Sequence, residues 1–148
     1  MSLLKETITS IKPLNKEAMA AAQERLDSLT KPPGSLGRLE TLALQAAGIY
    51  EKSIPQINKK AIVVMAGDHG VVEEGVSAFP QEVTTQMLMN FVRGGAAINV
   101  LGRHEGAEII LVDVGIANPL DDPGVLKFNI RRGTENFTKG PAMALEEA

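Results

Sequence analysis

The sequence predicts an α/β protein with a Rossmann-like parallel sheet and helices, preceded by an N-terminal helical hairpin, in a fold that is incomplete. Three observations predict this class. The first fifty residues have helical periodicity, two short continuous apolar runs follow at 61–67 and 107–115, and helical patterns lie between those runs. Continuous β-branched runs that end at glycine are typical of strands buried on both faces of a parallel sheet.

The N-terminal hairpin is predicted from two helical segments on either side of a proline-rich turn. In 15–30, alanine, methionine and leucine recur at helical spacing, and Asn15 is a suitable N-cap. The pair Pro32–Pro33 cannot continue a helix. Ser35 is expected to cap a second helix over 36–52, so the connection between the helices is short and stiff.

A crossover between two parallel strands is predicted for the next part of the chain. Val83, Met87 and Phe91 are spaced four residues apart and predict a helix that starts near Pro80. The segment "GAAINVLGRHEG" predicts a second helix, ended by Gly106. A strand–helix–strand connection of this kind is expected to be right-handed.

Two weaker elements complete the expected fold. Residues 125–130 have the composition of a third strand, and Pro141 suits the first turn of a helix that stops after about two turns. A doubly wound domain would be expected to continue, so the sequence looks cut within an element. We therefore expect two parts: 1–56, a helical segment with its connector, and 57–148, the first part of an α/β domain truncated at its C-terminus.

Composition excludes several classes of protein. The 148 residues carry a net charge of −3 without a basic block, which gives no reason to expect nucleic acid as a partner. The absence of cysteine excludes disulfides and thiolate zinc sites. Apolar runs are far shorter than the roughly 20 residues that a membrane span needs. The N-terminus lacks the pattern of a signal peptide, so we expect a cytoplasmic protein without membrane contact.

Polar residues follow both predicted strands. Asp68 and His69 come after the first and Asp113 after the second, and ligands bind outside the carboxyl ends of parallel strands. These three residues are therefore expected to face one crevice. A zinc site is disfavoured, because the chain has only one other histidine, His104. The sequence leaves open whether Asp68 and His69 contact a ligand or cap and hydrogen-bond the loop.

The segment "SAFPQEVTTQMLMNF" offers a different kind of site. Met87 and Phe91 on the inner side of its helix would suit a flat apolar ligand. Ser77, Gln81 and Gln86 could hydrogen-bond heteroatoms of that ligand, with Gln86 at the rim. The alternative is that the Met/Phe stripe belongs to the hydrophobic core, as stripes of this kind at helical spacing more often do.

Two further loops have features of ligand binding. Arg93–Gly95 leads into a helix and could hold a phosphate on backbone N–H groups, although it matches neither the Walker A nor the dinucleotide pattern. The segment 131–141 combines basic, hydroxyl and amide side chains in a glycine-bounded loop. It is either a ligand loop or an ordinary solvated turn.

Several stretches together resemble one known family. "TKPPGSLGRLE", "AGDHGVVEEGVSAFPQEVT", "GGAAINVLGR", "DVGI" and "RGTENFTKGPAM" occur in the order found in the nicotinate-nucleotide:dimethylbenzimidazole phosphoribosyltransferase family of cobalamin biosynthesis. The resemblance runs from about Leu26 to Met143. Each motif is weak alone, but the combination is specific.

The resemblance implies a reaction and its substrates. Members of the family transfer the phosphoribosyl group of nicotinate mononucleotide to 5,6-dimethylbenzimidazole, giving α-ribazole 5′-phosphate and nicotinate. The implied fold is a Rossmann-like sheet with a small helical domain, assembled as a homodimer, with no cofactor and no metal. The implied substrate-binding residues are Ser77, Phe79, Pro80, Gln81, Gln86, Met87, Asp68 and His69.

No catalytic residue is assigned within this chain. In the family the general base is a glutamate near the C-terminus of a longer protein, which we expect beyond residue 148. Glu73, Glu74 and Glu82 are carboxylates near the expected site, but the motifs give none of them this role. Other readings are a binding module, one half of a split enzyme, an inactive fragment, or a regulatory domain that binds nucleotide without turnover.

Overall fold

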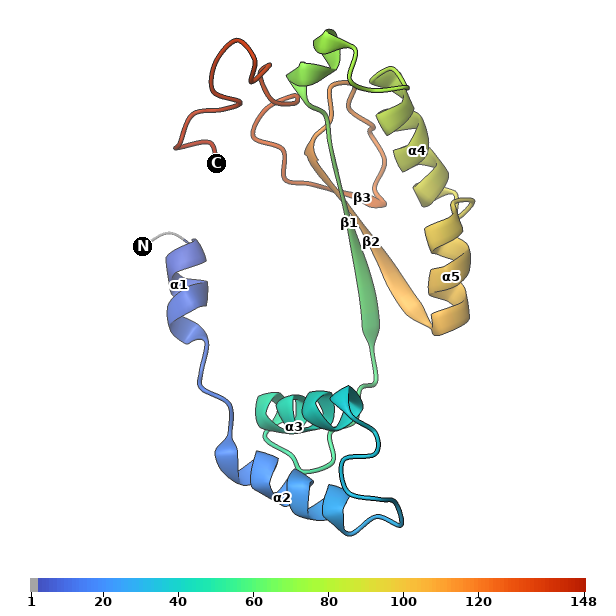
Figure 1. Cartoon of the computed structure of the whole chain (residues 1–148). Coiled ribbons are helices and arrows are strands. Elements are labelled where there is room, and N and C mark those ends of the chain that lie inside the picture. Colours follow the sequence, from blue (N-terminus) through green and yellow to red (C-terminus); the bar gives the residue numbers. More distant parts are fainter. Residues whose placement is uncertain (1–2) are drawn as a thin grey trace. The chain divides into compact units, whose positions relative to one another are not determined.

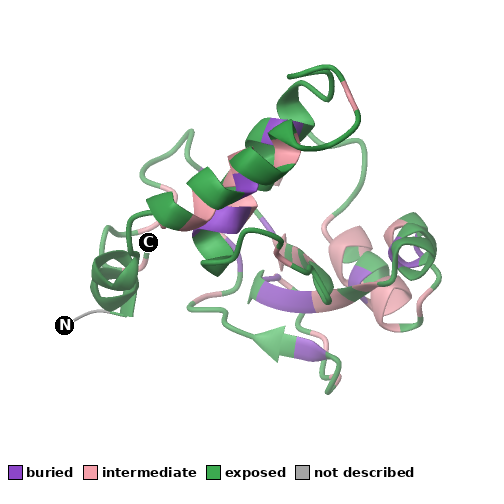
Figure 2. Cartoon of the chain, turned by 90° about the horizontal axis from the view of Figure 1, so that it is seen from below, coloured by how far each residue is buried: buried purple, intermediate pink, exposed green. Residues whose placement is uncertain are grey.

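The computed structural model describes residues 3–148. The chain forms two compact units that divide between Ile57 and Asn58. Each unit has its own secondary structure and is described by itself (Figure 1). Most of the described residues are exposed, and the buried ones lie in short stretches of the strands and helices and at a few loop positions such as Asp68 and Asn136 (Figure 2).

The N-terminal unit is helical. It contains α1 (Leu3–Ser10), α2 (Lys16–Asp27) and α3 (Arg38–Tyr50), and α2 packs against α3. Asn15 caps α2 as predicted, because its Oδ1 accepts a hydrogen bond from the Ala18 N–H at 2.8 Å. The helical hairpin predicted from the sequence is therefore confirmed.

The turn between α2 and α3 differs from the prediction. Ser35 does not cap α3, which begins at Arg38 after Gly37 with φ of 54°. The side chain that stabilises this turn is Glu40. Its Oε1 accepts hydrogen bonds from Lys31 Nζ at 2.8 Å and from the Leu36 N–H at 3.1 Å. Glu40 is only 9% exposed, so a buried ion pair holds the turn.

The C-terminal unit contains a parallel sheet with helices. Its elements are β1 (Lys60–Gly67), η1 (Gly70–Glu74), α4 (Glu82–Val92), α5 (Ala97–Glu105), β2 (Ala107–Gly115) and β3 (Val125–Lys127). The described strands are all parallel, in the order β1-β2-β3. Figure 1 shows α4 and α5 following one another along the same side of this sheet. The predicted crossover is confirmed, and Gly106 ends α5 with φ of 63°.

The core of this unit lies between the sheet and α4. Leu88, Leu111, Ile116 and Val125 form its fully buried cluster, with Phe91 among the partly buried side chains packed around it. Burial of such side chains is the main favourable contribution to folding. The core is small for a sheet of this kind.

In the C-terminal part, the predicted third strand is shorter than expected and the predicted last helix is wrong. The third strand forms at Val125–Lys127 and ends there. The Phe128 N–H still donates to the Asp113 carbonyl at 2.9 Å, and the side chains of Phe128 and Ile130 are exposed. Residues 140–148 form turns instead of a helix. A segment of about two turns is too short to be helical without packing against a neighbour, and here Ala144 N–H bonds to the Glu147 carboxylate.

Within residues 3–148, no helix combines the length and apolar composition needed to cross a bilayer.

The Lys31–Glu40 pair predicts a pH-dependent stability of the N-terminal unit. The hydrogen bond from Lys31, then that from the Leu36 N–H, lowers the pKa of Glu40 below its ordinary value of 4.5. A depressed folded-state pKa stabilises the fold above the ordinary value, and the contribution is lost as pH falls through the folded value. Glu40→Gln should therefore reduce the loss of stability below pH 4.5.

Tyr50 on α3 is the sole tyrosine and the chain has no tryptophan, so tyrosine fluorescence during urea unfolding follows this unit. Glu24→Gln on the exposed side of α2 is the matched control and should leave the acid profile as it is in the parent. Identical acid profiles for Glu40→Gln and the parent would contradict the assignment.

Gly70 predicts a second stability effect, in the C-terminal unit. A Cβ at this position would lie 2.6 Å from the Asn136 nitrogen and 2.7 Å from the Thr134 oxygen, both backbone atoms. Gly70→Ala should therefore destabilise this unit by about 1–3 kcal/mol, because the two chain segments must separate. Gly140→Ala is the control, since a Cβ there meets nothing within 4 Å. Thermal unfolding followed by circular dichroism compares the two, and equal melting temperatures would refute the close approach.

Candidate functional site

Asp68 joins several segments at the carboxyl end of β1. Its Oδ1 accepts a hydrogen bond from Thr84 Oγ1 at 2.7 Å, and its Oδ2 accepts one from the Ala117 N–H at 2.7 Å. Its backbone N–H donates to the Gly115 carbonyl, and its carbonyl accepts from the Thr134 N–H. With 6% exposure and both carboxylate oxygens bonded, Asp68 fixes the position of its neighbours.

Asp113 has a local role at the end of β2. It is 2% exposed, and its Oδ1 accepts hydrogen bonds from the N–H groups of Gly115 and Ile116 at 2.8 and 2.9 Å. The expectation that Asp113 shares a crevice with Asp68 and His69 is wrong. Its carboxylate closes the turn that follows its own strand and does not line the cavity beside β1.

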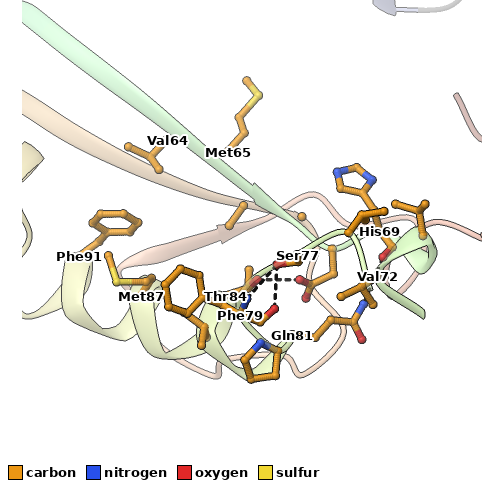
Figure 3. Close-up of a pocket in the computed structure, with 17 residues that line it drawn as sticks. Val64, Met65, His69, Val72, Ser77, Phe79, Gln81, Thr84, Met87 and Phe91 are labelled. Atoms are coloured by element: carbon orange, nitrogen blue, oxygen red, sulfur yellow. Dashed lines mark hydrogen bonds between the residues drawn. The ribbon is translucent and has the colours of Figure 1, made fainter. Parts of the chain in front are cut away.

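A cavity of about 510 Å³ lies between the end of β1, the loop that follows it and α4 (Figure 3). This volume is in the usual range for small-molecule sites. The residues that line it are Val64, Met65, Ala66, Gly67, Asp68, His69, Val71, Val72, Val76, Ser77, Phe79, Pro80, Gln81, Val83, Thr84, Met87 and Phe91. The structure thus brings together all the proposed substrate-binding residues except Gln86.

The apolar wall of the cavity comes from α4 and the turn before it. Phe79, Met87 and Phe91 lie in a row on this side (Figure 3). Phe79 is 67% and Met87 39% exposed, whereas Leu88, the next residue on α4, is fully buried in the core. The helix therefore divides the stripe: Leu88 belongs to the core, Met87 faces the cavity, and Phe91 contacts both.

Gln86 lies outside the cavity. Its side chain is exposed on α4 and is absent from the lining, contrary to the rim position expected from the sequence. Successive residues of a helix are turned by about 100°. The step back from Met87 carries Gln86 away from the side of α4 that lines the cavity through Val83, Thr84, Met87 and Phe91.

Polar side chains line the part of the cavity formed by the segment between β1 and α4. Ser77 Oγ donates to the Phe79 carbonyl and accepts from the Phe79 N–H, so it closes the turn that presents the phenyl ring. Gln81 Nε2 donates to the His69 carbonyl at a long 3.5 Å. His69 Nδ1 lies 3.4 Å from Thr134 Oγ1, and its ring projects away from Phe79 and Met87 (Figure 3).

A second, polar cavity of about 310 Å³ lies between η1 and the loop 134–141. Lys139 Nζ is 2.5 Å from Glu73 Oε2; this contact lowers the pKa of Glu73 and raises the pKa of Lys139. Glu74 Oε1 accepts hydrogen bonds from Asn136 Nδ2 at 2.6 Å and Thr138 Oγ1 at 3.1 Å. Both glutamates therefore hold this loop against η1.

The Arg93–Gly95 segment is not arranged to hold a phosphate. Its backbone N–H groups bond to carbonyl groups of the preceding turn: Arg93 to Met89, Gly94 to Phe91 and Gly95 to Asn90. The donors that a phosphate would need are therefore used to end α4. Among the described residues, no three histidine, aspartate or glutamate side chains converge as metal ligands would.

Sequence reasoning missed part of the site. Thr84 was not singled out, although it is the side chain that ties α4 to Asp68. Val71 and Val72, which line the cavity from η1, were also missed. This apolar pair lies between two glycines in an otherwise polar loop. Two adjacent valines in such a loop could have indicated that the loop contributes an apolar surface to the site.

Comparisons with known proteins agree on one family. A family model described as "Phosphoribosyltransferase" matches residues 11–148. Nicotinate-nucleotide–dimethylbenzimidazole phosphoribosyltransferases of Desulforamulus reducens and Geobacter metallireducens are 53% and 54% identical to this chain over its full length. The chain spans 43% and 42% of the length of these two relatives.

Solved structures give the same result. One is the nicotinate-nucleotide–dimethylbenzimidazole phosphoribosyltransferase of Thermus thermophilus. Its superposition covers 90% of this chain and 41% of the Thermus chain, with 50% sequence identity and a TM-score of 0.85. A structure of CobT from the same organism matches 88% of this chain with a TM-score of 0.83. On the family match, the sequence identity and the shared fold, this chain belongs to the nicotinate-nucleotide–dimethylbenzimidazole phosphoribosyltransferase family.

Proposed function

We propose that this chain supplies the aromatic-base site of an enzyme that transfers phosphoribose from nicotinate mononucleotide to 5,6-dimethylbenzimidazole. The observation that carries the proposal is the cavity beside β1, with an apolar wall of Phe79, Met87 and Phe91 and polar side chains from the segment between β1 and α4. A flat, largely apolar heterocycle with two nitrogens suits such a cavity. The names of the relatives supply the identity of the base.

The reaction requires three events in one place. One nitrogen of the base attacks the anomeric carbon of the ribose, the bond from that carbon to nicotinate breaks, and the other nitrogen of the base loses its proton. The cavity can hold the base and orient the attacking nitrogen, which converts an encounter in solution into a reaction within one complex. A general base must accept the proton.

Among the described residues, no free carboxylate lines the cavity to take that proton, and Glu82 is absent from the lining. Of the residues that the structure describes, Asp68 is the only carboxylate that lines the cavity. Both of its carboxylate oxygens already accept hydrogen bonds. Glu73 and Glu74 are bonded to the loop 134–141. This favours a division of labour in which the present chain binds the base and another region supplies the catalytic glutamate.

The alternative function is binding without turnover, either as a separate module or as one half of a split enzyme. The observation that favours it is the same lack of a free carboxylate, together with the 42–43% of the relatives' length that the chain spans. We further propose, from the family resemblance, that the full protein acts in the cytoplasm as a homodimer and that the two units are parts of its small helical and α/β domains.

Phe79 gives the sharpest test of the base site. Phe79→Ala should weaken the binding of 5,6-dimethylbenzimidazole about 2- to 13-fold, because an aromatic contact contributes about 0.5–1.5 kcal/mol beyond its buried area. Isothermal titration calorimetry on the 148-residue chain measures the dissociation constant directly. The side chain is 67% exposed, so its removal should leave the fold intact.

Gln86→Ala is the matched control for Phe79→Ala. It removes a side chain from the same segment that does not line the cavity, so the dissociation constant should stay as in the parent. Binding that is weakened equally by both substitutions, or by Gln86→Ala alone, would remove this cavity as the base site.

The isolated chain should be a poor enzyme. A well-placed general base contributes about 10²–10⁴-fold to rate, and among the described residues no free carboxylate lines the cavity. The assay supplies nicotinate mononucleotide and 5,6-dimethylbenzimidazole to the purified chain and measures α-ribazole 5′-phosphate. Turnover at the rate of the Geobacter metallireducens relative, measured alongside as the positive control, would place a base within the present sequence.

A further inference from the structure

The short helix η1 contributes to the lining of both cavities of the C-terminal unit. Val71 and Val72 line the cavity beside β1. Gly70 and Glu73 line the polar cavity instead, since residues three apart in a 3₁₀-helix lie on the same side of it. Figure 3 shows Val72 and Phe91 at different ends of the cavity beside β1, so η1 supplies an apolar part of the lining that α4 does not.

The position of η1 depends on contacts outside it. The helix has five residues, none of them is buried, and its N-cap residue His69 makes no side-chain capping hydrogen bond. A single turn of 3₁₀-helix has poor hydrogen-bond geometry, and forming one turn is unfavourable without support from its surroundings. The groups bonded to η1 therefore decide where its two valines lie.

The loop 134–141 holds both ends of η1. At the first residue, the Gly70 N–H donates to the Thr134 carbonyl at 3.0 Å. At the last residue, Glu74 Oε1 accepts a hydrogen bond from Asn136 Nδ2 at 2.6 Å. Asn136 is only 6% exposed, and its Oδ1 accepts a backbone N–H of its own loop at 3.1 Å. The amide is therefore fixed to the loop that it joins to η1.

The two adjacent glutamates of η1 are bonded in different ways. Glu73 pairs with Lys139, and the side chains are 60% and 65% exposed. Exposed ion pairs contribute little, because water competes for both charges and salt screens them. Glu74 is bonded to the buried amide of Asn136, which loses its partner when Glu74 is removed. The end of η1 therefore depends more on Glu74 than on Glu73.

We propose that Glu74 is a positioning residue for the selectivity of the base site. Bonded to Asn136, it holds η1 so that Val71 and Val72 limit the size of the aromatic base that the cavity accepts. Glu74 is absent from the lining of this cavity, so it acts through η1 and not by contact with the base. The inference rests on the proposed function, because it takes the cavity beside β1 as the base site.

Two bases of different size test the proposal. Isothermal titration calorimetry on the 148-residue chain measures the dissociation constants of 5,6-dimethylbenzimidazole and of a naphthimidazole, in which a fused ring stands in place of the two methyl groups. Glu74→Ala should lower the ratio of the naphthimidazole constant to the dimethylbenzimidazole constant about tenfold, as a misfit of one methylene does in an apolar pocket. A merely structural role would weaken both bases alike and leave the ratio unchanged.

Three further variants of η1 serve as controls. Glu74→Gln keeps an acceptor oxygen for Asn136 and should keep the ratio of the parent. Glu73→Ala removes the same kind of side chain from the next position, and it should also keep the ratio because its partner is exposed. Glu74→Asp is one methylene shorter and should change the ratio in the same direction as Glu74→Ala. It provides the measurement if circular dichroism shows that Glu74→Ala is unfolded.

Val72→Ala tests the wall directly. It removes two methyl groups from the lining without changing Glu74, so it should also lower the ratio. In the double variant with Glu74→Ala, the ratio should fall by less than the product of the two single effects, because both substitutions act on one wall.

The outcomes separate the role of Glu74 from the base site itself. A parent chain that binds neither base would overturn the base site and this inference with it. When the parent binds 5,6-dimethylbenzimidazole, three results would overturn the role of Glu74 alone. They are an unchanged ratio in Glu74→Ala, an equal change in Glu73→Ala, and independent effects of the two substitutions in the double variant.

Discussion

The hydrogen bonds of Asp68 are the constraint on which the site depends. This residue is the first after β1, and four contacts join it to α4, to the segment after β2 and to the loop at Thr134. A buried carboxylate is stable only when its oxygens are satisfied, and here a threonine hydroxyl and a backbone N–H satisfy them. The same bonds hold three chain segments, distant in sequence, at one end of the sheet.

The cavity follows from this arrangement. Thr84 fixes the first turn of α4 relative to β1, and this sets which side of the helix faces the core and which faces the cavity. Leu88 then enters the core and Met87 remains 39% exposed at the cavity wall. An exposed methionine and phenylalanine beside fixed polar groups form a surface suited to a flat ligand. The polar network of η1 with Asn136, Thr138 and Lys139 supports the other side of the loop.

Both units have few fully buried side chains, and each is held together in a different way. In the N-terminal unit a buried ion pair, Lys31 with Glu40, holds the turn that the prolines begin. In the C-terminal unit, α4 packs against the sheet around the core, whereas Val63, Met65 and Leu126 on the strands are exposed. Both units bury few side chains completely, and Leu88 and Ile116 are the large apolar ones. A site built on such a small core depends strongly on polar bonds to keep its shape.

The sequence by itself determined the class of fold, the two long strands, their helices, the Asn15 cap and the family. These rest on local signals, because periodicity, caps and motifs are read from residues that are near each other in the chain. Only the tertiary structure decided that Asp68 is bonded inward, that Asp113 lies outside the cavity, and that Met87 lines it whereas Gln86 does not. Ser35, the end of β3 and the residues after Pro141 were mispredicted for a related reason. Partners distant in sequence decide which candidate donors, strand pairs and short helices form, and no local pattern records them.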